Sequence, residues 1–235
     1  MQFMGRKLRH ELKYYLHPHT YADLRRRVAV LFPRDPHSVC ADGYSIRSLY
    51  FDGPHDHALS DKKSGIFSRE KFRIRIYNGC DRFIRLERKS RYGEWVSKES
   101  APLTREEYDR LLAGDGLFLE TGPKLYRDFY DAIARRGYKP SVIVDYVREA
   151  YFCEPGGARI TFDKRLSAAV NTTDLFDPGM VTVETLEHSL TIMEIKYGAY
   201  LPEFARRLVQ ADMRRAAISK YAICRDYFLR HHTFA

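Results

Sequence analysis

Residues 69–98, REKFRIRIYNGCDRFIRLERKSRYGEWVSK, decide the fold because charged and apolar side chains alternate along them. Successive side chains of a strand point to opposite faces of a sheet. The first predicted strand therefore has a cationic face and an apolar face, formed by Lys71, Arg73 and Arg75 and by Phe72, Ile74 and Ile76. After the turn signal at residues 78–79, a second strand repeats the alternation with Arg85, Glu87 and Lys89 against Ile84 and Leu86. A third short strand, residues 94–98, adds Lys98.

This row of like charges needs a physical explanation. Like charges that face each other on neighbouring strands repel, so an ordinary sheet mixes signs or uses Ser and Thr on its wet face. For any single Lys or Arg, the solvated face of a basic protein is the simpler interpretation. For the whole group, a bound polyanion is favoured, because phosphate oxygens supply charge-assisted contacts to several cations at once.

Composition bounds the class of protein. The 235 residues, 44% hydrophobic and 14% aromatic, are enough for one domain with a real core, so we expect a single domain over residues 1–235. The formal net charge of +9 predicts attraction to anions: nucleic acid, anionic lipid or phosphorylated small molecules. Net charge alone does not choose among these.

Cysteine spacing and hydropathy bear on location. The four cysteines, Cys40, Cys80, Cys153 and Cys224, form no pair or Cys/His cluster with zinc spacing, which favours a reducing, cytoplasmic compartment. The N-terminus lacks the apolar run of a signal peptide, and no later run is long enough for a membrane span. We therefore expect a cytoplasmic protein with no membrane span.

The charged and apolar alternation returns elsewhere in the chain. Further strands are predicted at residues 8–16, 44–51, 141–152, 159–165, 180–186 and 189–197, the last two as a hairpin across residues 187–188. Helices are predicted at residues 21–32, from a capping box at Thr104 to about Gly114, and at 124–136, 202–211 and 216–231. The additional charged positions on the strands are Arg9, Glu11, Lys13, Arg148, Arg159, Glu194 and Lys196.

If these strands close into an antiparallel barrel, the charged faces meet in one lumen. Burying so many unpaired charges is prohibitive, so such a lumen must hold water and a polyanion. Arg and Lys neutralise phosphate oxygens, while isolated Glu residues suit a divalent ion that bridges phosphates. The sequence has no GxxxxGK[ST] loop and no GxGxxG after a strand, so side chains must hold the phosphates.

Several segments in order resemble the triphosphate tunnel metalloenzymes, and within them the VTC (vacuolar transporter chaperone) polyphosphate polymerase domain. The resemblance runs from about Arg9 to Tyr221. It rests on RHELKYY (9–15), SLYFD (48–52), KFRIRIY (71–77), LERK (86–89), VDYVREAY (144–151), RITFD (159–163), MEIKY (193–197) and SKY (219–221).

The resemblance implies an α+β fold, a closed antiparallel eight-stranded β-barrel with flanking helices, that binds triphosphate or polyphosphate with Mn²⁺ or Mg²⁺. Motif by motif, it implies phosphate contacts by Lys13, Arg73, Arg75, Lys89, Lys98, Arg148, Arg159 and Lys220, and a metal ligand in Glu194. With the charge pattern, we predict catalytic roles for Arg73, Arg75, Lys89, Arg159 and Lys220. Substrate-binding roles are predicted for Arg9, Lys13, Lys71, Arg85, Lys98, Arg148 and Lys196, and metal binding for Glu194, Glu11 and Glu87.

The implied activity is transfer of the ATP γ-phosphate onto a growing polyphosphate chain. Metal-dependent hydrolysis of triphosphate or polyphosphate, and polyphosphate binding without turnover, stay open. The first strand carries one glutamate where the ExExK form of the CYTH triphosphatases has two, and Lys98 follows LERK at a shorter spacing than expected. The expected partners are ATP, triphosphate or polyphosphate, not nucleic acid. We expect neither the SPX domain nor the membrane helices of the eukaryotic complex.

Overall fold

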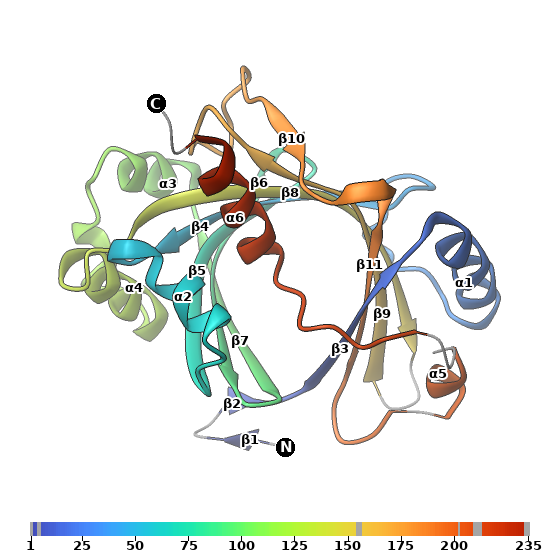
Figure 1. The fold of residues 1–235 in the computed structure, drawn as a ribbon. Coiled ribbons are helices and arrows are strands. Elements are labelled where there is room, and N and C mark those ends of the chain that lie inside the picture. Colours follow the sequence, from blue (N-terminus) through green and yellow to red (C-terminus); the bar gives the residue numbers. More distant parts are fainter. Residues whose placement is uncertain (1, 4–5, 154–156, 202, 209–212, 233–235) are drawn as a thin grey trace.

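The computed structural model describes residues 2–3, 6–153, 157–201, 203–208 and 213–232. A mixed α and β fold is built on an antiparallel sheet of nine strands, with the order β3-β11-β9-β8-β4-β5-β6-β7 and with β10 paired to β9. The sheet curves strongly, so that one face is concave and encloses the middle of the molecule (Figure 1). The strands are β3 (His10–Leu16), β4 (Tyr44–Asp52), β5 (Ser68–Tyr77), β6 (Cys80–Tyr92), β7 (Trp95–Leu103), β8 (Lys139–Cys153), β9 (Ala158–Ala169), β10 (Thr182–Glu184) and β11 (Thr191–Tyr197). A separate pair is β1 (Gln2–Phe3) with β2 (Arg6–Lys7).

The sheet is not closed, so the prediction of a closed eight-stranded β-barrel is wrong. Its end strands are β3 and β7, which among the described residues are joined by one bridge, where the backbones of Arg9 and Val96 exchange hydrogen bonds of 3.1 and 3.0 Å. The free edge of β3 is instead used by the segment before the last helix. Tyr14 bridges to Arg215, and the backbone N–H of residue 216 donates to the Lys13 carbonyl at 2.9 Å. This segment takes hydrogen-bonding groups that barrel closure would need.

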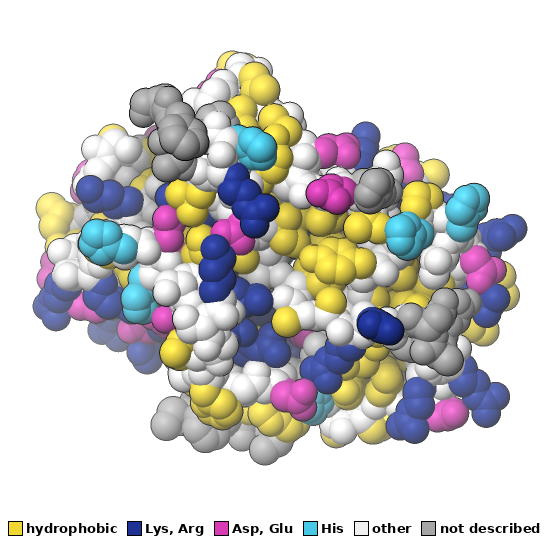
Figure 2. Space-filling model, viewed as in Figure 1, with side chains coloured by type: hydrophobic (Ala, Val, Ile, Leu, Met, Phe, Trp, Pro, Cys, Tyr) yellow, Lys and Arg dark blue, Asp and Glu magenta, His cyan; other side chains and the backbone are white. Residues whose placement is uncertain are grey.

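Helices cover the two convex sides and one opening of the curved sheet (Figure 1). On one side lie α3 (Arg105–Leu112) and α4 (Lys124–Ala134), and on the other α1 (Pro18–Leu31) and α5 (Glu203–Arg207). The opening carries α2 (His57–Lys63) and α6 (Lys220–His232). Lys and Arg side chains gather near the middle of this face (Figure 2).

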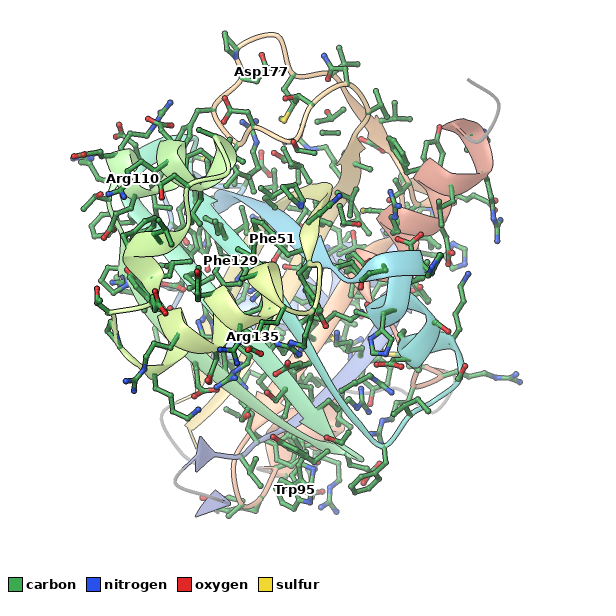
Figure 3. All side chains as sticks on the ribbon, turned by 90° about the vertical axis from the view of Figure 1, so that its left-hand side faces the viewer. Phe51, Trp95, Arg110, Phe129, Arg135 and Asp177 are labelled. Carbon is green, nitrogen blue, oxygen red and sulfur yellow. The ribbon has the colours of Figure 1, made fainter. Side chains whose placement is uncertain are left out.

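The apolar strand faces pack outward against helices. Phe72 of β5 and Phe129 of α4 are fully buried in one hydrophobic cluster, together with other apolar residues of β5 and β6. The rings of Phe51 and Phe129 meet edge to face at 4.9 Å (Figure 3). The Thr104 capping box that begins α3 is confirmed, because Thr104 and Glu107 exchange both of its hydrogen bonds.

Backbone conformation and strand pairing account for one confirmed expectation and one correction. Asn78 and Gly79 have φ values of 52° and 64°, as a tight hairpin turn requires. Strands β10 and β11 both pair with β9, so the hairpin expected across residues 187–188 is wrong. Arg165 has φ 52° beside a β-bulge and is exposed, so it leaves the face that Thr161 and Asp163 share.

The remaining expectations concern the C-terminal helices, the cysteines and the membrane. The helix expected at residues 216–231 begins at Lys220, and part of the one expected at 202–211 lies outside the described residues. Cys40, Cys80 and Cys224 are free thiols. Within the described ranges, no helix is both long and apolar enough to cross a bilayer.

Candidate functional site

The concave face brings together the charged positions of seven strands and α6. The strand register places several predicted residues opposite one another: Glu194 with Lys13, Lys196 with Glu11, Arg73 with Glu87, Lys71 with Lys89, and Lys89 with Lys98. Lys220 joins them from α6. The predicted inward faces are therefore confirmed for these residues, although their charges are largely paired with one another.

Glu87 is the centre of the first charge cluster. Its side chain is 1% exposed, and Oε2 accepts hydrogen bonds from Arg73, with Nη2 at 2.6 Å and Nε at 2.8 Å. Lys98 Nζ lies 2.8 Å from Oε1, and Arg75 Nη1 lies 3.8 Å from Oε2. Burial by itself raises the pKa of Glu87, but Arg73, Arg75 and Lys98 hold it well below its ordinary value. Glu87 is therefore a fixed anion that orders three cations.

Neutral hydroxyl groups orient the same two arginines. Arg73 Nη1 donates to the Tyr50 hydroxyl at 2.8 Å, and Arg75 donates to Ser48 Oγ at 3.0 Å and to the Tyr146 hydroxyl at 3.3 Å. We did not predict roles for Ser48, Tyr50 or Tyr146 from the sequence. The alternation of side chains along the strands could have identified them. Ser48 and Tyr50 lie directly opposite predicted cations on the neighbouring strand, and Tyr146 lies two residues before the predicted cation Arg148.

Glu194 and Asp163 form the second cluster. Lys220 Nζ lies 2.6 Å from a carboxylate oxygen of each. Arg148 makes a two-pronged contact with Asp163 at 2.6 and 2.7 Å and lies 3.7 Å from Glu194, and Lys196 Nζ lies 2.9 Å from Glu194. Burial raises the pKa of both carboxyl groups, yet the surrounding cations hold each pKa below its ordinary value. Asp163 was missing from the predicted site, although it lies four positions after Arg159, and so on the same face, in the strand predicted at residues 159–165.

Glu11 connects these clusters along the concave face. Lys89 Nζ lies 2.6 Å from Glu11 Oε2, and Arg9 lies 3.7 Å from Oε1. Lys13 Nζ lies 3.3 Å from Glu194 and also donates to a backbone carbonyl ahead of α6 at 2.9 Å. Burial lowers the pKa of Lys89 to about 8, although Glu11 opposes the shift. The approach of a further anion would raise this pKa again.

Lys71, Arg159 and Arg85 lie outside these two clusters. Lys71 makes no ion pair with any described residue, and its ammonium lies 4.2 Å from the Tyr221 ring. Arg159 turns to the other end of the face, where it meets the Asp35 carboxylate at 2.5 Å and the Tyr44 hydroxyl at 2.8 Å. Arg85 is half-buried and likewise has no ion pair within the described part of the chain.

This pairing corrects one step of the sequence argument. We expected the inward charges to be unpaired and therefore to require water and a polyanion. Instead, Glu11, Glu87, Asp163 and Glu194 each hold two or more cations. The cations still outnumber the carboxylates, so the face keeps a positive excess that suits an anion of many charges.

The donor atoms of the concave face bear on the divalent ion that the resemblance implies. The described residues contain no group of three or more His, Cys, Asp or Glu side chains that could hold a metal by themselves. Near Glu194, the buried oxygen atoms Glu11 Oε1 and Thr161 Oγ1 have no hydrogen-bond partner among the described residues. Thr161 of β9 lies directly opposite Glu194 of β11, and Glu11 of β3 lies diagonally opposite the same glutamate. One or two carboxylates with phosphate and water oxygens suit Mg²⁺ or Mn²⁺, so Glu194 fits an ion shared with substrate.

Comparison with known proteins adds a family model and a shared fold. The model described as the VTC domain matches residues 8–229. A candidate adenylate cyclase from Bacillus halodurans is 13% identical, with a TM-score of 0.50 and coverage of 87% of both chains. A second one, from Vibrio parahaemolyticus, is 13% identical with a TM-score of 0.50, covering 93% of this chain and 98% of that one.

A protein from Pyrococcus horikoshii OT3 is 14% identical, with a TM-score of 0.50 and coverage of 92% of this chain and 99% of that one. At such identities these structures establish a common fold alone. A comparison with curated proteins gave no match.

Proposed function

The chain belongs to the VTC domain family, and on that premise we propose that it transfers the γ-phosphate of ATP onto the end of a linear polyphosphate chain. The observation that carries the proposal is the concave face, where basic side chains exceed the four interleaved carboxylates Glu11, Glu87, Asp163 and Glu194. Such a face favours a ligand with many negative charges and many acceptor oxygens. Linked phosphate groups have both properties.

In this reaction a terminal oxygen of the acceptor chain forms a bond to the γ-phosphorus of ATP. The bond from that phosphorus to the oxygen bridging the β- and γ-phosphates breaks, and ADP leaves with the electron pair. Phosphoryl transfer depends mainly on positioning and charge stabilisation. Arg73 and Arg75, held by Glu87 and by neighbouring hydroxyl groups, are suited to bind the transferred group through planar N–H donors.

The remaining cations have supporting roles in this scheme. Lys220, Arg148 and Lys196 neutralise phosphate oxygens beside Glu194, which is the residue suited to hold Mn²⁺ or Mg²⁺. When bound there, the ion withdraws charge from the phosphate oxygens that it contacts. Lys89, with its lowered pKa, gains its full charge as an anion approaches.

One assay separates the candidate activities. Purified protein is incubated with ATP, Mn²⁺ and a short polyphosphate primer, and chain length, ADP and free phosphate are measured together. The proposal predicts chain growth matched by ADP, with little free phosphate. Free phosphate without chain growth identifies a hydrolase, and polyphosphate binding without ATP consumption identifies a binding module; either result rejects the proposed transferase. Arg105→Ala is the control variant, because Arg105 is an exposed residue of α3 whose partner is Asp109.

A further inference from the structure

At the outer ends of β5 and β6, the concave face changes from paired to unpaired charge. Arg73 faces Glu87 across the two strands, but the next charged pair outward is Lys71 with Lys89. Beyond it, Arg69 faces Arg91. Like charges directly opposite each other destabilise a sheet. The ladder therefore places like charges opposite each other at two successive positions on the same face, and of these four side chains Lys89 is also paired with Glu11.

A further cation, Lys62, approaches from α2. The pKa of Lys62 is lowered, first by burial and then by the charges of Arg69 and Arg91. Burial and Arg91 lower the pKa of Arg69 in the same way. We call Lys62, Arg69, Lys71 and Arg91 the cationic rim; all four side chains are half-buried.

The hydrogen bonds of the cationic rim reach neutral groups. Arg69 Nη1 donates to the Ile66 carbonyl at 2.8 Å, and Arg91 Nε donates to the Gly93 carbonyl at 2.7 Å. Lys71 donates to the Ser219 hydroxyl at 3.4 Å. These acceptors are neutral. No member of the rim makes an ion pair with any residue in the described ranges.

Three acidic residues offset part of the rim charge without forming an ion pair with it: Asp52 acts on Lys71, Asp61 on Arg69 and Asp226 on Lys62. Each also has a partner of its own, and Asp52 accepts hydrogen bonds from the Ala58 backbone N–H and the Tyr221 hydroxyl. Asp226 lies 2.6 Å from Lys63 Nζ, and Asp61 lies 3.6 Å from His57. Glu70, although its chain neighbours belong to the rim, points to the other face of β5 and pairs with Arg88 and Arg136. The rim thus differs from the inner face, where carboxylates separate the cations.

The direction of the rim indicates the shape of its ligand. Residues 69, 71, 73 and 75 alternate along β5, so the rim continues the row begun by Arg75 and Arg73. With a rise of roughly 3.3 Å per residue, the row from Arg75 to Arg69 is about 20 Å long. Three linked phosphate groups are shorter than this row, so a triphosphate on the inner face leaves the outer cations unfilled.

Resting on the phosphate-transferring function proposed above, we propose that the cationic rim binds successive phosphate groups of a linear polyphosphate chain whose end lies on the inner concave face. The rim thereby gives long chains an affinity advantage over triphosphate. It also marks the side on which the chain leaves the protein, beside α2.

The test uses a triple variant, Lys62→Ala, Arg69→Ala and Arg91→Ala, in the full chain. Tripolyphosphate and long-chain polyphosphate are titrated against it at constant salt without divalent ions. We expect tripolyphosphate affinity to stay within about twofold of wild type and long-chain affinity to fall at least about tenfold, since charge-assisted contacts are lost. Removing facing like charges relieves repulsion, so thermal unfolding should show a folded protein; Arg69→Gln with Arg91→Gln is the milder second variant.

A matched control removes the same formal charge elsewhere, by Arg26→Ala, Arg27→Ala and Arg206→Ala on α1 and α5. The control should bind both ligands like wild type. Unchanged affinity for the long chain in either rim variant, or an equal loss of affinity in the control, contradicts the proposal that the rim binds polyphosphate. If binding of the long chain depends on the rim but the protein does not consume ATP, the proposed transferase activity is rejected and the proposed rim site is retained. Chain growth from ATP together with unaltered long-chain binding in the rim variants rejects the rim alone.

Discussion

Lys220 Nζ in α6 lies 2.6 Å from Glu194 Oε1 in β11, 26 residues earlier in the chain. Both side chains are nearly buried, at 8% and 5% exposure. The last helix is therefore part of the candidate site and does more than cover the open end of the sheet. Its first residue holds the proposed metal ligand, Glu194, in its charged form.

Lys220→Met should destabilise the protein, because it leaves Glu194 and Asp163 side by side with one shared cation removed. Breaking a buried ion pair from one side costs about 3 kcal/mol. Both carboxyl groups have lowered pKa values in the folded state, so the stability they contribute is present above their unfolded pKa and lost as pH falls. Urea unfolding should show a larger loss at pH 7 than at pH 4. Lys139→Met, at an exposed position without an ion pair to a described residue, is the control; an equal loss in both variants contradicts the prediction.

Glu194→Gln separates an enzyme from a polyanion receptor. The change keeps the shape and removes the negative charge, so polyphosphate affinity should be equal or higher. Consumption of ATP at limiting Mn²⁺ should fall, because the proposed metal ligand has lost its charge. Thermal unfolding of the variant checks that its neighbours still hold the fold. Unchanged activity would place the ion elsewhere, with Glu11 and Glu87 the next carboxylates to test.

Arg73→Lys tests the planar donor group rather than the charge. Replacement by alanine would strand the buried Glu87, whereas lysine keeps a positive charge beside it. The fork that reaches Glu87 and Tyr50 is lost, so tripolyphosphate affinity should fall about tenfold, or about 1.4 kcal/mol. Calorimetric titration measures it. A folded variant with wild-type affinity and turnover would remove Arg73 from the site.

Lys71→Met should stabilise the protein near pH 6.5. Burial lowers the pKa of Lys71 to about 7, against 10.5 for an ordinary lysine, although Asp52 opposes the shift. Below pH 7 the folded protein bears the cost of a buried ammonium, and this cost shrinks as the folded state loses the proton between pH 7 and 10.5. The stability advantage of the variant should therefore shrink by pH 9.5. Urea unfolding at the two pH values measures it, and a constant difference would contradict the assignment.

The candidate site was predictable where it depends on strand parity. Arg73, Arg75 and Glu87 share the concave face because side chains alternate along each strand, and alternation is visible in the sequence. Asp163 and the orienting Tyr50 were missed for a different reason. Their partners, Lys220 and Arg73, come from other elements, so their roles depend on which strands and helices become neighbours.

By itself, the sequence determined most of the strands, their two faces and the capping box that begins α3, since these follow from periodicity, turn residues and capping. It did not reveal α2, and it placed the starts of α1 and α6 three or four residues away from where they lie. Tertiary structure alone decided whether the sheet closes and which charges pair. Closure depends on which segment forms hydrogen bonds with the free edge of β3. Many segments could do so, because backbone N–H and C=O groups are the same at every residue except proline. Lys13 offers its carbonyl to residue 216 instead of to β7, and nothing in the local pattern of either segment reveals that choice.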